Sequence, residues 1–130
     1  MTSDKRSIFP EGGPKPGGPY SPAIVSGGFV FVAGQVGNDP ATGHLSGDTI
    51  EAQTRQALLN IGTLLRASGC GYEDVVKTTA YLLRADDFQS FNAVYSEFFP
   101  EPFPARSTVV CALVRPELLV EVDVIARLPG

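Results

Sequence analysis

The chain of 130 residues has few of the residues on which metal sites, disulfide frameworks and histidine catalysis depend: two cysteines, one histidine and no tryptophan. Cys70 and Cys111 lie far apart, and neither has a second cysteine or a histidine at ligand spacing. This spacing argues against a zinc site or a structural disulfide and indicates two reduced thiols. His44 lies in a turn-like segment, so we expect a surface residue rather than a metal ligand or a base.

Long apolar runs and clustered basic residues are also lacking. No uninterrupted apolar stretch reaches the length needed to cross a bilayer, although 43% of the residues are apolar. The first charged residues are not followed by the apolar block of a secretion signal, so we expect a cytoplasmic protein. The formal net charge is -4 and the ten basic residues are scattered, which argues against a nucleic-acid or membrane partner.

The residues that are present predict a single α+β domain over residues 1–130. Asp48 and Asp86 are the expected N-caps of two helices, and Glu51 would complete a capping box with Asp48. The order ββαβαββ predicts a mixed sheet with both helices on one face. The expected strands are 23–25 and 29–36, which form a hairpin, then 75–83, 105–114 and 119–127; the expected helices are 50–65 and 88–98.

Two connections and one face of this sheet carry further expectations. The segment 10–22 is rich in glycine and proline and should be a surface loop. The short segment 115–117 should turn the last two strands into a hairpin. Both faces of the strand 105–114 are largely apolar, but two helices cover only one face of the sheet. We therefore expect other copies of the chain to cover the second face; the alternative is that loops cover it.

Arg106 and Glu121 are charged residues in otherwise apolar strands, where a charge is costly unless it is paired or used. The simplest interpretation is an ion pair of Arg106 with Glu121 or Glu101. In the expected hairpin, however, Arg106 lies opposite Ala126, about 17 Å along the strand from Glu121. The two side chains could then meet only between copies, where the guanidinium would bind a small carboxylate and the glutamate would serve acid–base chemistry on water.

Short motifs along nearly the whole chain resemble a known family. They are GPYSPA (18–23), VAGQV (32–36), QT (53–54), NI (60–61), DVVK (74–77), FNAVY (91–95), FF (98–99), PARS (104–107) and VEV (120–122). In this order they resemble the RidA/YjgF reactive-intermediate deaminases. The resemblance implies a chorismate-mutase-like fold and a homotrimer with sites between subunits. It also implies hydrolysis of 2-aminoacrylate and related 2-imino acids to 2-keto acids and ammonia, without a cofactor or metal.

The same resemblance implies roles for individual residues. Arg106 would anchor the substrate carboxylate, Glu121 would place or activate water, and the Gly34 backbone N–H would donate to the substrate. Tyr20 and Asn92 would be polar groups that line the cleft, with Tyr20 close enough to the reacting atoms to take part in catalysis.

Two positions depart from the family pattern. Ala33 and Thr108 stand where active members commonly have serine and cysteine. A substrate contact at Ala33 must then come from the backbone, whereas Thr108 keeps a small polar group. The alternative function is a trimeric protein that binds small carboxylates without turnover, for regulation. A third interpretation, a ribonuclease or translation inhibitor, has been attached to relatives, and the acidic charge balance argues against it.

Overall fold

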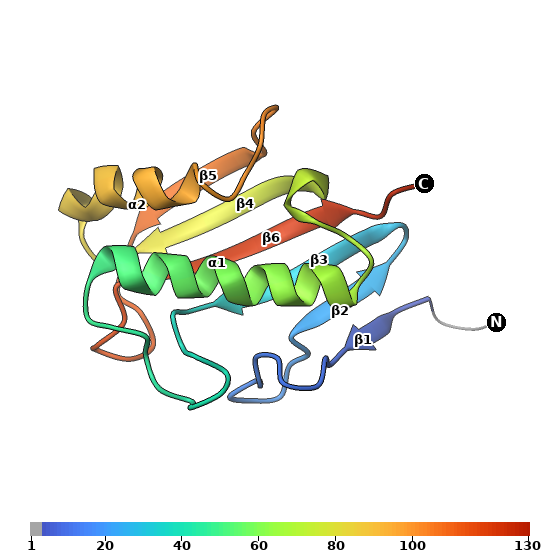
Figure 1. The fold of residues 1–130 in the computed structure, drawn as a ribbon, viewed down its shortest axis with the longest axis horizontal. Coiled ribbons are helices and arrows are strands. Elements are labelled where there is room, and N and C mark those ends of the chain that lie inside the picture. Colours follow the sequence, from blue (N-terminus) through green and yellow to red (C-terminus); the bar gives the residue numbers. More distant parts are fainter. Residues whose placement is uncertain (1–3) are drawn as a thin grey trace.

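The computed structural model of the protein describes residues 4–130, in which six strands form one mixed sheet of order β1-β2-β3-β6-β4-β5 (Figure 1). All neighbouring strands pair antiparallel except β4 and β5, which are parallel. The strands are β1 (Arg6–Ile8), β2 (Ala23–Ser26), β3 (Phe29–Gln35), β4 (Val75–Leu82), β5 (Ala105–Val110) and β6 (Val120–Arg127), and the helices are α1 (Ile50–Ala67) and α2 (Phe88–Tyr95).

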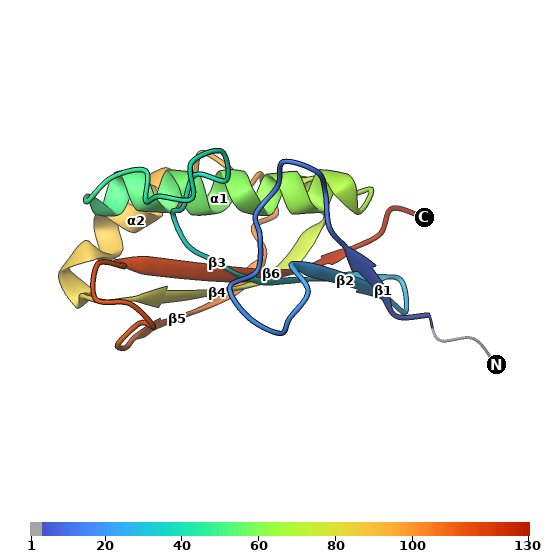
Figure 2. The same ribbon diagram turned by 90° about the horizontal axis from the view of Figure 1, so that it is seen from below.

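Both helices lie on the same side of the sheet (Figure 2). The core lies between them and the sheet, where α1 buries Leu58, Ile61 and Leu65 against β3 and β6 residues such as Val30 and Val122. We call the side that carries no helix the open face. The predicted α+β class, with two helices on one face of a mixed sheet, is confirmed.

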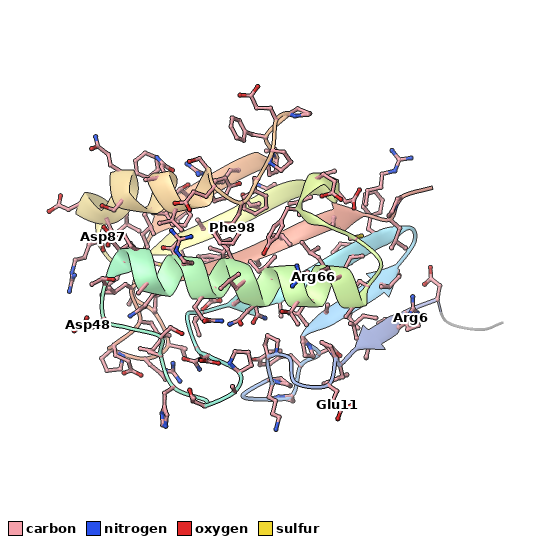
Figure 3. The ribbon with its side chains drawn as sticks, viewed as in Figure 1. Arg6, Glu11, Asp48, Arg66, Asp87 and Phe98 are labelled. Atoms are coloured by element: carbon pink, nitrogen blue, oxygen red, sulfur yellow. The ribbon has the colours of Figure 1, made fainter. Side chains whose placement is uncertain are left out.

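The start of α1 differs by one residue from the prediction. Thr49, not Asp48, is the N-cap, and its Oγ1 accepts a hydrogen bond from the Ala52 N–H at 3.1 Å. Asp48 precedes the helix and Arg66 lies in its last turn (Figure 3), so charges of the favourable sign flank the helix dipole. Asp48 and Thr49 are both residue types that cap helices well, and Thr49, with an extended backbone, is the cap in the structure.

The second helix is shorter than predicted. Its N-cap is Asp87 rather than Asp86, and no side chain caps it, because residues 85–87 form a 3₁₀ turn that leads directly into α2. The helix ends at Tyr95 instead of Phe98. Phe98 nevertheless stays in the apolar layer, where its ring packs edge-on against Tyr72 at 5.6 Å.

The predicted hairpin of the last two strands is wrong. β5 pairs in parallel with β4, and β4 separates it from β6. Parallel neighbours need a crossover connection, and α2 supplies it between β4 and β5. Arg106 therefore lies beside Thr78, not opposite Ala126. Residues 111–119 form a connection that carries the chain past the end of β4, with the Leu83 N–H bonded to the Leu119 carbonyl at 3.0 Å.

The other local predictions can be stated briefly. The hairpin of β2 and β3 is confirmed, residues 10–22 form a loop, and His44 is exposed. The three-residue strand β1, which pairs with β2 at the edge of the sheet, was not predicted. Both cysteines are free. No helix within residues 4–130 combines the length and hydropathy needed to cross a membrane.

Candidate active site

Four of the seven candidate site residues line one cleft. Tyr20, Ala33, Gly34 and Glu121 come from the loop before β2, from β3 and from β6, and together they border an open cavity of about 800 Å³. The residues are distant in sequence, but β3 and β6 are neighbours in the sheet and the loop before β2 lies against the end of β3. We call this cavity the Glu121 cleft.

Glu121 lies on the open face of β6, since its neighbours Val120 and Val122 point into the core. Its side chain is partly buried. The pKa of the Glu121 carboxyl is raised, first by the loss of solvation on burial and second by the nearby Asp123 carboxylate. The cleft therefore contains a carboxyl group that holds its proton to a higher pH than an exposed glutamate does.

Gly34 makes the room that Glu121 occupies. A Cβ at position 34 would overlap the Glu121 Oε2 and would lie 2.9 Å from its Cδ. The pairing of β3 with β6 shifts register between Val32 and Gln35, so Ala33 and Gly34 sit in a bulge. A bulge leaves a residue outside the ladder, which is the setting in which a backbone N–H can serve a ligand.

Tyr20 is the exposed aromatic group of the cleft. Half of its side-chain surface is accessible (50%), which leaves the ring free to contact a ligand or a neighbouring protein. Its hydroxyl accepts a hydrogen bond from the Gly17 N–H at 3.0 Å, so the loop that carries it also orients it. Nearby, the Ala33 N–H donates to the Pro22 carbonyl at 2.9 Å, which fixes this loop to β3.

The other three candidates form a second group on α2 and β5, which we call the Arg106 ledge: Arg106, Thr108 and Asn92. The Arg106 guanidinium carbon lies 4.7 Å from the centroid of the Tyr95 ring, within cation–π distance. Thr108 lies two residues further along the same face of β5. On α2, Asn92 Oδ1 is buried without a hydrogen-bond partner among the described residues.

The aromatic support of Arg106 comes from one face of α2. The guanidinium carbon also lies 5.6 Å from the Phe88 centroid and 5.5 Å from that of Phe91. Three rings at positions i, i+3 and i+7 of the helix thus hold the cation, and Tyr95 is itself tied to β4 through a 2.8 Å hydrogen bond to Thr78. This support orients the guanidinium without neutralising it.

The cleft and the ledge lie on opposite faces of the sheet in one protomer. Arg106 packs against a helix, whereas Glu121 belongs to the open face. In the observed register Arg106 aligns with Thr78 and Glu121 with Tyr81, so they are about 10 Å apart along the strands and two strands apart across the sheet. Among residues 4–130, Arg106 forms no ion pair with Glu121, Glu101 or any other acid.

Two residues beside Glu121 were not among the sequence candidates. Tyr81 is the direct cross-strand partner of Glu121, and its hydroxyl donates to Asp123 Oδ2 at 2.9 Å. Asp123 lies on the same face of β6 as Glu121. Tyr81 could have been found only from the pairing of β4 with β6, because this pairing is what places it opposite Glu121.

No cluster of three or more histidine, cysteine, aspartate or glutamate side chains within residues 4–130 is arranged to hold a metal ion. The cleft offers a carboxyl group with a raised pKa and a tyrosine, and the ledge offers a guanidinium and small polar groups. Such a set suits a small carboxylate and proton transfer.

Comparison with known proteins agrees with this fold. The family model described as Endoribonuclease L-PSP matches residues 11–128. A RutC family protein of Pyrococcus horikoshii is 46% identical over 122 residues, which cover 94% of this chain and 97% of the relative. The 2-iminobutanoate/2-iminopropanoate deaminase of Homo sapiens is 36% identical over 109 residues, covering 84% of this chain and 80% of the human protein.

A solved structure gives the same result. The crystal structure of E. coli TdcF with bound serine superposes with a TM-score of 0.89 at 30% identity, covering 96% of this chain and 100% of that one. The chain belongs to the Endoribonuclease L-PSP family, which is the RidA/YjgF family that its motifs resemble. Members of this family include proteins named as imine deaminases.

Proposed function

We propose that the protein hydrolyses 2-imino acids and their enamine forms, such as 2-aminoacrylate, to 2-keto acids and ammonia. We further propose that each site combines the Glu121 cleft of one protomer with the Arg106 ledge of the next, in a homotrimer that acts in the cytoplasm. The observation that carries the proposal is the separation of Glu121 from an unpaired, ring-supported Arg106 on the opposite face. Relatives named as imine deaminases support the reaction type.

The positions of the two half-sites favour a ring. Contact between two different surface patches is heterologous, and it closes into a ring when the rotation between neighbours allows it. A two-fold dimer could join a cleft to a ledge only if one surface patch contained both, and here they lie on opposite faces of the sheet. The open face also leaves apolar side chains exposed, among them Phe31 and Val109, which such an assembly would cover.

The chemistry assigns a distinct task to each half-site. The Arg106 guanidinium binds the substrate carboxylate with two parallel hydrogen bonds and fixes its orientation. Protonation of an enamine at its terminal carbon gives the imine, one water adds to the imine carbon, and ammonia leaves as the keto acid forms. We assign to Glu121 the donation of this proton and the placement of the water, and the upward shift of its pKa, caused first by burial, favours the proton-donating form.

A non-catalytic binding protein is the second candidate, and one observation favours it. At position 33 the cleft has an alanine where active family members commonly have a serine, so it lacks that hydroxyl, while Arg106 would still bind a carboxylate. The TdcF structure with bound serine is an example of a relative that holds a small amino acid. A turnover assay separates the two candidates. A binding protein would bind keto acids but would not accelerate the hydrolysis of imines.

The deciding assay generates a panel of 2-imino acids in situ and measures the release of keto acid with and without the protein. We expect acceleration by the wild type, loss of it in Arg106→Ala by about 10²-fold or more, and partial recovery in Arg106→Lys, which keeps the charge but not the two-pronged geometry. Arg55→Ala is the matched control, because Arg55 also lies over a ring, that of Phe98, but far from the cleft. Full activity of Arg106→Ala would overturn the proposal.

A further inference from the structure

Glu121 has a second acidic residue and a tyrosine as neighbours on the open face. Asp123 follows it by two residues on β6, so their Cα atoms are about 7 Å apart and both side chains point to the same side. Tyr81 pairs directly with Glu121 across the β4–β6 ladder, and its hydroxyl reaches diagonally to Asp123 Oδ2 at 2.9 Å. The three side chains therefore form one contiguous group.

The hydrogen bond from the Tyr81 hydroxyl to Oδ2 holds the Asp123 side chain in place. The same contact raises the pKa of Tyr81, first through the hydrogen bond with Asp123, so the tyrosine remains a donor. Among residues 4–130, Asp123 forms no ion pair, and the amino group of Lys77 on the same face is bonded to Ser107 Oγ at 3.0 Å. The Asp123 charge is thus not neutralised within the protomer.

We propose that Asp123 and Tyr81 are positioning residues: Tyr81 holds the Asp123 carboxylate beside Glu121 on the open face, and this held group helps to set the pH at which Glu121 exchanges its proton. The pair does not touch the substrate. Its role in turnover rests on the proposed deaminase function, whereas its effect on Glu121 does not. A neighbouring negative charge favours the protonated form of Glu121, which is the form that can donate a proton to the enamine carbon.

Titratable and charged groups surround Glu121 on several elements. Asp123 and Tyr81 face it from β6 and β4, and Cys111, which follows β5, lies close enough to Tyr81 to raise the pKa of its hydroxyl. From β3, Gly34 contributes no charge. The remaining titratable groups that line the same cleft are Lys15, Tyr20, Asp39 and Arg115. Arg115 is held by Glu117, to which its Nε lies at 3.0 Å, so its charge is largely neutralised locally.

The test is a direct titration of the Glu121 carboxyl by carbon-detected NMR in the intact oligomer. Two carboxylates on residues whose Cα atoms are about 7 Å apart, at a partly buried site, interact by on the order of one pH unit. Asp123→Asn, which keeps the shape and removes the charge, should lower the pKa of Glu121 by about that amount. Asp123→Glu, which keeps the charge, should leave it close to the wild-type value. Tyr81→Phe should give a smaller downward shift, because Asp123 is then charged but no longer held.

The expected downward shift in the pKa of Glu121 also predicts a change in the kinetics. Lowering the pKa of Glu121 moves the pH profile of kcat/KM to lower pH: the falling limb moves if Glu121 acts as an acid, and the rising limb if it acts as a base. The positioning role also predicts a change in kcat larger than in KM. An unchanged Glu121 titration in both Asp123→Asn and Tyr81→Phe would overturn this inference, whatever the activity. A shifted titration in a protein without turnover would support it and count against the deaminase instead.

Discussion

Gly34→Ala tests the geometry of the Glu121 cleft with a single methyl group. The backbone at Gly34 is in a region that any residue adopts, so the substitution introduces no strain in φ. The new Cβ would, however, overlap the Glu121 Oε2 and lie 2.9 Å from Cδ and 3.1 Å from Cγ. Since carbon atoms pack no closer than roughly 3.5 Å, the carboxyl group must move by more than about 1 Å.

The expected cost falls on activity rather than on folding. A displacement of about 1 Å at a catalytic group reduces turnover by about 10²-fold. Glu121 is only partly buried and the colliding atoms are at the end of its side chain, so it can swing outward, and the stability should change by less than about 1 kcal/mol. Gly34→Ala should therefore keep the wild-type unfolding temperature within a few degrees.

The assay is keto acid release from 2-aminoacrylate generated in situ, with Glu121→Gln and the double variant measured in parallel. If Gly34→Ala acts by displacing Glu121, the double variant should be no slower than Glu121→Gln alone, because the two changes remove the same interaction. Wild-type turnover in Gly34→Ala would refute the geometry. Independent, additive losses would show that Gly34 serves through its own backbone instead.

Two further predictions concern assembly and stability. Phe31→Glu should dissociate the oligomer in light scattering, because Phe31 is exposed on the open face, whereas Leu59→Glu on α1 should not, although the two side chains are equally accessible (44% and 46%). Gln53→Ala should destabilise the protein by about 3 kcal/mol in thermal unfolding, since the buried amide donates to Gly47 O and Glu117 O and accepts from the Leu119 N–H. Gln56→Ala, nearer the surface, is its control; an equal loss of stability in both would contradict this reasoning.

The elements themselves were largely predictable because their signals are local. Alternating β-branched residues indicated β3 and β4, and the apolar spacing in 50–65 indicated α1, within one to three residues of the observed ends. The edge strand β1 escaped because three residues carry no periodicity. Asp48 and Thr49 are adjacent and both suit an N-cap, so residue type alone could not decide which of them begins the helix.

The pairing of β5 was mispredicted because a local turn was given more weight than a crossover. Pro116 and its neighbours resemble a hairpin turn, yet a strand, a helix and a strand in succession (β4, α2, β5) form the unit that makes parallel neighbours. The correction moves Arg106 from a position opposite Ala126 to one beside Thr78, where the rings of α2 support its guanidinium, a support that the sequence did not predict. It does not bring Arg106 and Glu121 together.

For the candidate site, residue types could be identified from the sequence but not their grouping. The sequence motifs named Tyr20, Ala33, Gly34 and Glu121 separately, and only the β3–β6 pairing and the loop before β2 place them in one cleft. Tyr81 was missed because its significance depends on the register of β4 against β6.

The most direct test of a site shared between protomers is to mix two inactive variants. Arg106→Ala keeps the cleft and Glu121→Gln keeps the ledge, so equimolar random assembly should restore about one quarter of the wild-type activity, whatever the number of subunits in the ring. Each variant alone gives the background. Activity that stays at this background, in mixtures that mass spectrometry shows to contain both variants in the same oligomers, would contradict a shared site.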